Sequence, residues 1–351
     1  HAIIRLMTKT TQIAADRAFD EAKTVLPAEV ARGVYIENPP GAEALKLMHL
    51  LIGKAGGRMA DDVRHELRLA DIKKIEGMRN HTRATLRKLF IELAGAVIVF
   101  DDTEAQCEII GGFLDRAKLD YRHEVSDDLL VAWWFGGAFR EMAEKSCHWA
   151  IIDRQTVFAL SSKYSILLFQ HVASLVNLNH ITSKTFTVAE LRAILGVADG
   201  KLKRWTHLNR DALLPAIAEI NQTSRLTLTA TPRKIGRTVA SVTIAWEEKP
   251  QEAKKEAKRE LGRPKVGRVA RRDGKTEMLV PPFPASGGLS PSITLDAHWR
   301  ALFEAHVTRI QGGHLPDSKL VCDAFRKSRG DKLDDTTTEK HFINFCKAWR
   351  G

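Results

Sequence analysis

The same order of hydrophobic and polar patterns occurs twice along the chain. In the first stretch, apolar residues recur at three- and four-residue steps over residues 42–55 and alternate over 64–69. Helical spacing then returns over 70–76 and 79–94, with Gly77 between, and apolar or β-branched runs follow at 96–100, 108–114 and 119–125. The pattern predicts a helix, a strand, two helices joined by a turn, and further strands. This order is typical of a winged helix.

The second stretch repeats the order with clearer spacing. It predicts a helix over 162–176, a strand over 185–187, a short helix over 188–195, a connection over 196–204 and a longer helix over 208–221. Leu213, Ile217 and Ile220 lie on a single face of that longer helix. Two alternating strands, 226–230 and 239–246, flank a basic tip at 231–238. A second winged helix is therefore expected.

The remaining segments are less regular. Residues 128–143 fit either a strand or a helix, and we expect the pair Trp133 and Trp134 to lie in a core or interface rather than to stack on bases. Residues 1–30 are polar and are interpreted as an arm. Residues 249–290 combine charge with proline and glycine, which favours a flexible linker with a helix in its first half. Apolar faces return over 291–351 and predict a small helical region.

The expected architecture is α+β and mainly helical, with two winged-helix domains in tandem. The N-terminal arm covers 1–30, the first winged-helix domain 31–155, the second 156–248, the basic flexible linker 249–290, and the small C-terminal helical domain 291–351. A length of 351 residues suits several domains that each bury a core.

Charge narrows the choice of partner. The chain has 54 Lys and Arg against 43 Asp and Glu, a net charge of +11, and residues 249–275 alone hold 11 basic against 4 acidic side chains. Such a balance favours a polyanionic partner, although a basic surface kept for solubility would look alike. We expect a cytoplasmic protein with no membrane association, because the chain has no apolar run of about 20 residues and no secretory signal.

Enzyme signatures are missing from the sequence. The four cysteines are scattered, no two histidines stand two residues apart, and the only tyrosines are Tyr35, Tyr121 and Tyr164. A zinc site or a nicking enzyme with a His-x-His metal site is therefore disfavoured. Gly274, Lys275 and Thr276 resemble the end of a phosphate loop, but Val269 stands where its first glycine belongs. We expect no catalytic residue, no metal and no cofactor.

The longer helix of the second domain is the strongest candidate for reading DNA. In a helix-turn-helix the second helix enters the major groove, where arginine suits guanine, asparagine suits adenine, and aspartate accepts from cytosine or positions a neighbouring arginine. The competing interpretation is a solvated helix start with Asn209 near the cap. The candidate residues are Lys201, Lys203, Arg204, His207, Asn209, Arg210 and Asp211.

Three further groups could contact DNA. Arg233, Lys234 and Arg237 lie at the tip between two strands, where a wing would meet phosphates, although a charged edge that blocks aggregation has the same composition. Residues 262–265 resemble a minor-groove hook, with Arg263, Lys265 and Arg268 as contacts, or form a generic basic tether. In the first domain the candidates are Arg79, Asn80, His81, Arg83, Arg87 and Lys88.

Four short motifs in order connect the second domain to a known family. They are Ser162-Lys163-Tyr164-Ser165 at the start of a long helix, Leu191-Arg192 with Leu195-Gly196, Pro215-Ala216 with Glu219-Ile220-Asn221, and Lys234-Ile235-Gly236-Arg237 before a strand. On these residues the chain resembles the initiator replication proteins of iteron plasmids. Residues 31–155 resemble the first winged helix of that family by pattern alone.

The resemblance implies that the second winged helix reads iteron repeats in double-stranded origin DNA through Asn209, Arg210 and Asp211, with Arg233, Lys234 and Arg237 as the wing. It also implies a first winged helix that contacts the DNA backbone and mediates dimerisation. Family members help to melt the origin, recruit the host replication initiator and helicase, and as dimers repress their own gene at an inverted repeat. In one departure from the family, Asp211 ends the basic run at the helix start.

Three other functions remain open at this point. A winged-helix transcriptional repressor or partition protein would use the same fold without starting replication. A nicking enzyme would form a covalent adduct with origin DNA. A protein-assembly module would bind partners through its winged helices, with the charge serving solubility alone.

Overall fold

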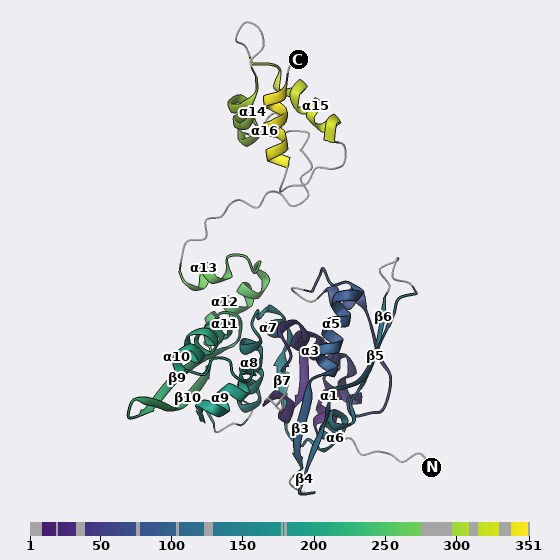
Figure 1. Ribbon diagram of the computed structural model, residues 1–351, viewed down its shortest axis with the longest axis vertical. Helices are drawn as coiled ribbons and strands as arrows, with labels where there is room; N and C mark the ends of the chain where they lie inside the picture. The colour runs from purple at the N-terminus through teal and green to yellow at the C-terminus, as the bar shows by residue number, and fades with distance from the viewer. Residues whose placement is uncertain are drawn as a thin grey trace. The chain divides into compact units, whose positions relative to one another are not determined.

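The computed structural model describes residues 9–18, 20–32, 39–74, 78–102, 105–122, 129–176, 178, 181–274, 297–308, 315–329 and 338–349. The chain divides into two compact units, His1–Gly274 (unit 1) and Lys275–Gly351 (unit 2). Unit 1 has a first half that runs through α7 and a second half that begins at α8 (Figure 1). None of the helices in the described segments is long and apolar enough to cross a membrane.

The first half mixes short helices with three small sheets. Its elements are α1 (Lys9–Asp16), β1 (Lys23–Pro27), α2 (Ala28–Ala31), α3 (Ala42–Ala55), η1 (Gly56–Arg58), β2 (His65–Arg68), α4 (Leu69–Lys73), α5 (Arg83–Ala94), β3 (Val97–Asp102), β4 (Cys107–Gly112), β5 (Leu114–Asp120), β6 (Leu130–Phe135), α6 (Gly137–Lys145), β7 (Trp149–Asp153) and α7 (Arg154–Ala159). The sheets are β1-β7, β2-β6-β5 and β3-β4, and every pairing is antiparallel.

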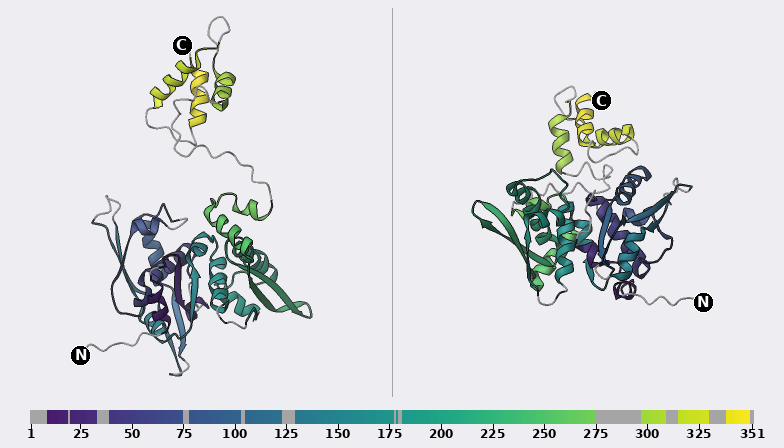
Figure 2. Two further views of the ribbon diagram at one scale, coloured as in Figure 1. Left: turned by 180° about the vertical axis from the view of Figure 1, so that it is seen from behind. Right: turned by 60° about the horizontal axis from the view of Figure 1, so that its bottom comes forward.

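The second half is simpler. It consists of α8 (Lys163–Val176), β8 (Ser183–Thr187), α9 (Val188–Ile194), α10 (Trp205–Leu208), the π-helical turn η3 (Asn209–Leu213), α11 (Leu214–Thr223), β9 (Leu226–Ile235) and β10 (Thr238–Glu248). The three strands form an antiparallel sheet in the order β8-β10-β9. In all the views, the hairpin β9–β10 extends beyond the helices of its half (Figures 1 and 2).

The two halves repeat one connectivity. In each, the strand that follows the first long helix pairs with the last strand of the final hairpin: β2 with β6, and β8 with β10. That last strand also pairs with its hairpin partner, β5 or β9. The hairpin β3–β4 has no counterpart among the described residues of the second half. It is inserted in the chain between the helix α5 and the strand β5 of the sheet β2-β6-β5. A mixed helix and strand fold is therefore confirmed.

Several boundaries differ from the sequence prediction. The helix expected over 79–94 begins at Arg83, because Thr82 caps it: its hydroxyl oxygen accepts from the Thr85 backbone N–H while the Thr85 hydroxyl accepts from the Thr82 N–H. The helix expected over 208–221 begins at Trp205, one turn before the first fully buried position, Leu208. The strand expected over 119–125 falls partly outside the described residues.

The ambiguous stretch 128–143 contains both kinds of structure. It forms the strand β6 and then, after Gly136, the helix α6. Trp133 is fully buried, as expected for a core residue. Trp134 is half-buried, and the guanidinium of Arg116 lies 4.3 Å from the centroid of its ring.

The stretch interpreted as an N-terminal arm is integrated into unit 1 over its described residues. The strand β1 pairs with β7 from Lys23↔Asp153 to Pro27↔Trp149. Val25 and Leu26 are buried in the core. The sequence does not indicate this pairing, because the segment is largely polar and its partner strand lies far away along the chain.

The basic stretch after β10 departs from the flexible linker expected over 249–290. It forms α12 (Gln251–Gly262), where a helix was expected, and then a second helix, α13 (Arg268–Arg272). Both belong to unit 1, and α12 packs against α11 and α7. Residues 275–290 lie outside the described residues.

Unit 2 contains the helices α14 (Ala297–His306), α15 (Ser318–Arg329) and α16 (Thr338–Ala348). A small core joins them through buried residues that include Phe303, Val321, Phe325, Phe342 and Cys346. The small helical region expected near the C-terminus is thus a unit with its own core. By contrast, the two halves of unit 1 share one continuous core.

Candidate nucleic-acid interface

The helical run α10–η3–α11 presents a polar face to solvent. Leu208, Ala212, Leu213 and Ile217 point inward and are buried, which leaves the intervening positions outside. Of the seven candidates on and before this run, six are exposed and Asn209 is half-buried. The exposed residues are Lys201, Lys203, Arg204, His207, Arg210 and Asp211. The structure therefore exposes these candidates along one helical run and in the loop that leads into it.

Arg210 and Asp211 form a bidentate pair on that surface. Nε of Arg210 donates to Oδ1 of Asp211 at 2.6 Å, and Nη2 donates to Oδ2 at 2.9 Å. This hydrogen bonding lowers the pKa of Asp211 and raises that of Arg210, so the pair is ionised at neutral pH. The donors of Nη1 and one donor of Nη2 are left for another acceptor. Asp211 thus restricts the orientation of an arginine whose side chain is 71% exposed.

Arg210 and Asp211 lie in the π-helical turn η3. A single π-helical turn inside an α-helix is uncommon and is frequently found at functional sites. Sequence periodicity does not reveal a π-helical turn, because the spacing of apolar residues changes little over five positions.

Arg192 positions the loop that leads into this helix. Its Nη1 donates to the Leu202 carbonyl at 2.6 Å, and its Nη2 donates to the Lys201 carbonyl at 2.7 Å. Leu202 adopts a φ of 45°, a left-handed conformation that a leucine rarely takes without such support. Arg192 was not among the predicted site residues. The signal that could have found it is its place in the Leu191-Arg192 motif.

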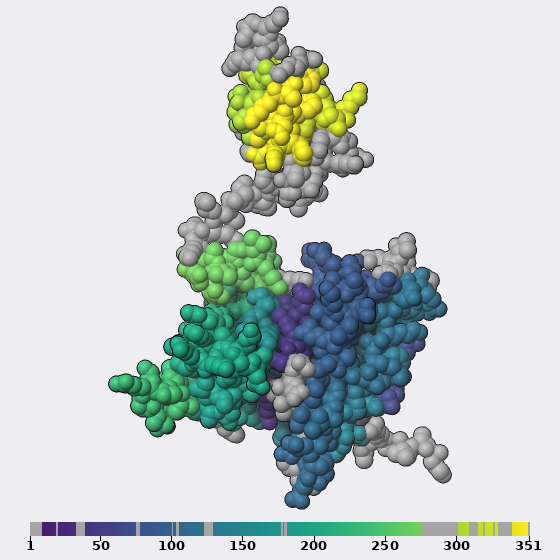
Figure 3. All heavy atoms as spheres, in the orientation of Figure 1, coloured from purple at the N-terminus to yellow at the C-terminus, as the bar shows by residue number. Residues whose placement is uncertain are grey.

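The hairpin β9–β10 carries the second group of cations. Arg233, Lys234 and Arg237 are all exposed, and the strands continue almost to the tip, so most of the predicted basic tip is strand. Gly236 makes the turn with a φ of 61°, where a residue without a Cβ meets no steric penalty. Figure 3 shows the hairpin standing out from the surface of unit 1. Its shape and charge suit contact with a polyanion.

The candidates in the first half divide into two kinds. Arg79, Asn80, Arg87 and Lys88 are exposed. His81 is buried, with Nδ1 at 3.0 Å from the Thr85 hydroxyl and Nε2 at 3.6 Å from a Glu43 carboxylate oxygen. Arg83 lies over the ring of Tyr121, 4.4 Å from its centroid. His81 therefore serves the local structure, which a pattern of residue types could not reveal.

The three minor-groove candidates are engaged within unit 1. Arg268 is buried, and its Nη1 donates to the Ala159 carbonyl at 2.9 Å. Lys265 donates to the Phe158 carbonyl at 3.3 Å, and Arg263 pairs with Glu256 and Glu260. This geometry does not present the three side chains together to a groove.

Glu260 explains why this basic segment folds. Its buried carboxylate accepts hydrogen bonds from Arg271, Arg263 and Arg268. Although burial opposes ionisation, the pairs with Arg271 and Arg263 lower the pKa of Glu260. Four ionised groups thus hold α12 and α13 together. Composition alone shows only an excess of positive charge in this segment.

No group of three or more His, Cys, Asp or Glu side chains suited to a metal ion is found in the described part of the chain. The described cysteines are all free thiols, with Cys107 and Cys147 exposed and Cys322 and Cys346 buried.

Comparison with known proteins gives one family and several structures. Residues 187–246, from the end of β8 almost to the end of β10, match the family described as "Initiator Rep protein, WH2". No curated protein sequence matches the chain. A crystal structure of Pi initiator protein in complex with iteron DNA is similar at 16% identity, covering 66% of this chain and 99% of that chain with a TM-score of 0.48. A structure of domains 2 and 3 of RctB is similar at 11% identity, covering 58% of this chain and 80% of that chain with a TM-score of 0.37.

Proposed function

We propose that this chain, whose residues 187–246 match the family described as "Initiator Rep protein, WH2", is a plasmid replication initiator that binds repeated sequences in origin DNA. The observation that carries the proposal is the exposed Arg210–Asp211 pair within the matched segment. In the same segment, the β9–β10 hairpin presents three exposed cations. Both features suit double-stranded DNA.

The helix and the hairpin have different tasks in this proposal. The run α10–η3–α11 enters the major groove, and the free donors of Arg210 bond to a guanine while Asp211 holds the guanidinium in place. Arg233, Lys234 and Arg237 neutralise backbone phosphates next to the groove. The residues Lys201, Lys203 and Arg204 approach the flanking backbone. Base contacts then supply specificity, and phosphate contacts supply most of the affinity.

We further propose that the first half of unit 1 is a second winged helix. The shared connectivity of the two halves supports this, with α3, β2, α4, α5, β5 and β6 in the roles of α8, β8, α9, α10–α11, β9 and β10. Arg79, Asn80, Arg87 and Lys88 would contact the DNA backbone. The same half would mediate dimerisation, and dimers would repress the gene of the protein at an inverted repeat.

Initiation in this proposal needs no catalysis by the chain. The protein would act in the cytoplasm, help to melt the origin, and recruit the host replication initiator and helicase. Its contribution is the positioning of other proteins on a chosen site.

One experiment separates initiation from repression. The protein is supplied in trans to a plasmid that carries only the origin, and replication of that plasmid is measured together with a footprint on the origin repeats. An initiator maintains the plasmid and protects the repeats, and Arg210→Ala weakens both effects. Protection without replication would identify a repressor or partition protein instead, and a covalent adduct with supercoiled origin DNA would identify a nicking enzyme.

A further inference from the structure

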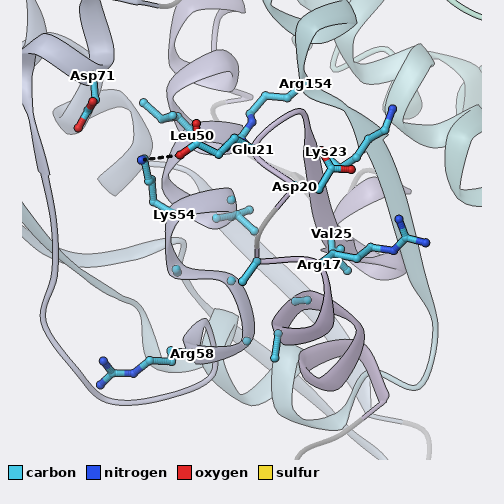
Figure 4. A pocket seen from close by; sticks show the side chains of 18 of the residues that line it. Arg17, Asp20, Glu21, Lys23, Val25, Leu50, Lys54, Arg58, Asp71 and Arg154 are labelled. Carbon is cyan, nitrogen blue, oxygen red and sulfur yellow. Dashed lines mark ion pairs between the residues drawn. The ribbon is translucent and has the colours of Figure 1, made fainter.

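A cavity of about 530 Å³ lies in the first half of unit 1, away from the α10–η3–α11 surface. Its lining comes from α1 and the described residues that follow it, from β1, from the C-terminal part of α3 with η1, from α4 and the residue after it, and from α7. Figure 4 shows the side chains that surround it, with Arg154 reaching in near Glu21 and Leu50. Its volume lies within the range of small-molecule sites.

Arg154 is a buried cation without an ion-pair partner among the described residues. The residue is 6% exposed, and its backbone N–H donates to the Ala22 carbonyl at 2.9 Å. No described carboxylate lies within 4.0 Å of its guanidinium. Burial lowers the pKa of Arg154 more than the attraction of Glu21 and Asp20 raises it. A buried charge of this kind is costly unless something compensates it.

Gly53 makes room for the guanidinium. A Cβ at this position would lie 2.5 Å from Nη1 of Arg154 and 3.1 Å from Oγ1 of Thr24. The Thr24 hydroxyl in turn donates to the His49 carbonyl at 3.2 Å. The absence of a side chain at Gly53 therefore lets the guanidinium of Arg154 lie against the backbone of α3.

The rest of the lining is positive in balance. It contains the cations Arg17, Lys23, Lys54, Arg58 and Lys74 besides Arg154, against the acids Asp20, Glu21 and Asp71. The acids already have partners: Asp71 pairs with Lys74 at 3.0 Å, Glu21 lies 3.7 Å from Lys54, and Asp20 accepts from the Ala22 N–H at 3.0 Å. Of these charged lining residues only Arg154 is buried, and no described carboxylate lies within 4.0 Å of its guanidinium.

We propose that this cavity binds a small phosphate-bearing molecule, with Arg154 as its main partner and Lys54 at the rim. A phosphate group offers the paired acceptor oxygens that a planar guanidinium matches, and its negative charge compensates the buried cation. The ligand is a free molecule rather than a phosphate of the DNA backbone. The cavity lining shares no residue with the α10–η3–α11 surface, so the proposed site stays open when DNA is bound there.

The probe for this site is inorganic pyrophosphate, titrated into the full chain by isothermal calorimetry. The wild-type protein is expected to bind with a submillimolar Kd, and binding should persist when an origin duplex is already bound. Arg154→Met should weaken pyrophosphate binding at least tenfold. Lys255→Ala, which removes an exposed cation of α12 far along the chain, is the matched control and should bind like the wild type.

Two milder variants guard against a loss of folding in Arg154→Met. Gly53→Ala displaces the guanidinium, and Lys54→Gln removes a half-exposed rim charge; both should weaken binding severalfold while circular dichroism stays unchanged. Wild-type protein that binds no pyrophosphate, or unchanged affinity in both variants, overturns the proposal. Displacement of pyrophosphate by the duplex also overturns it, because the phosphate would then be that of the DNA backbone.

Discussion

At the residue scale, the pair Arg210–Asp211 gives the sharpest test of how DNA is read. Arg210→Ala removes the free donors and should cost about 1–3 kcal/mol of binding to the cognate repeat, relaxing preference at one base pair. Asp211→Ala should have a smaller effect in the same direction, because the guanidinium stays but loses its orientation. Affinities for the cognate repeat and for single-base variants measure both changes.

Lys234→Ala is the matched comparison on the hairpin. It should weaken binding to cognate and random duplexes alike and reduce the slope of log K against log salt by about one. If Arg210→Ala and Lys234→Ala lower affinity equally on both duplexes, the proposed division between base and phosphate contacts is wrong.

Buried histidines make the stability of unit 1 depend on pH. Burial lowers the pKa of His49 from its ordinary value of 6.5 to about 4, and burial likewise lowers that of His171 to about 4. In the unfolded chain, His49 and His171 therefore bind protons near pH 6.5, whereas in the folded chain they bind them only near pH 4. The stability that each neutral histidine contributes is fully present above pH 6.5 and is lost as the pH falls through about 4, a loss of about 3 kcal/mol for each residue.

Urea unfolding at pH 7.5 and pH 5 tests this expectation. The midpoint should fall markedly at pH 5 in the wild type and less in His49→Gln, whatever the stability of that variant at pH 7.5. His148→Gln, at an exposed position, serves as the control and should keep the pH dependence of the wild type. An equal fall in His49→Gln and the wild type would contradict the assignment.

At the element scale, Glu260 should decide whether α12 and α13 stay attached to unit 1. Glu260→Gln leaves Arg263, Arg268 and Arg271 without their shared carboxylate. Removing one partner of a buried ion pair costs about 3 kcal/mol, so hydrogen exchange over α12 and α13 should speed up roughly 100-fold. Glu252→Gln, an exposed position of α12 paired with Lys255, should leave exchange unchanged. Equal exchange in the two variants would contradict this role.

Regular elements were predictable because their signal is local. The strict spacing of Leu213, Ile217 and Ile220 was enough to find the buried face of η3 and α11, and alternation was enough to find β9 and β10. Exposure of Arg210 followed from the same spacing. Local periodicity also identified the hairpin that carries Arg233, although not how far its strands extend.

Features that depend on distant partners were not predictable. The buried His81 lies 3.6 Å from a carboxylate oxygen of Glu43 on the helix α3, and the buried Arg268 pairs with Glu260 on the preceding helix. The pairing of β1 with β7 likewise joins segments far apart in the sequence. In each case residue type suggested a solvent-exposed role, whereas a tertiary contact decided the outcome.

At the scale of the whole molecule, DNA recognition should reside in unit 1. A chain that ends at Gly274 keeps the single core that joins both halves, together with α12 and α13. It should bind origin repeats with the affinity, sequence preference and salt dependence of the full chain, as measured by fluorescence anisotropy. A tenfold or greater loss of affinity would instead assign part of the interface to residues 275–351.

The continuous core beneath both halves of unit 1 has a consequence for the DNA itself. If each half contacts the duplex, unit 1 fixes the distance and rotation between the two contacted tracts of DNA. Inserting one base pair between those tracts moves them apart by about 3.4 Å and rotates them by about a tenth of a turn. The origin should therefore tolerate base changes in the intervening stretch far better than changes in its length.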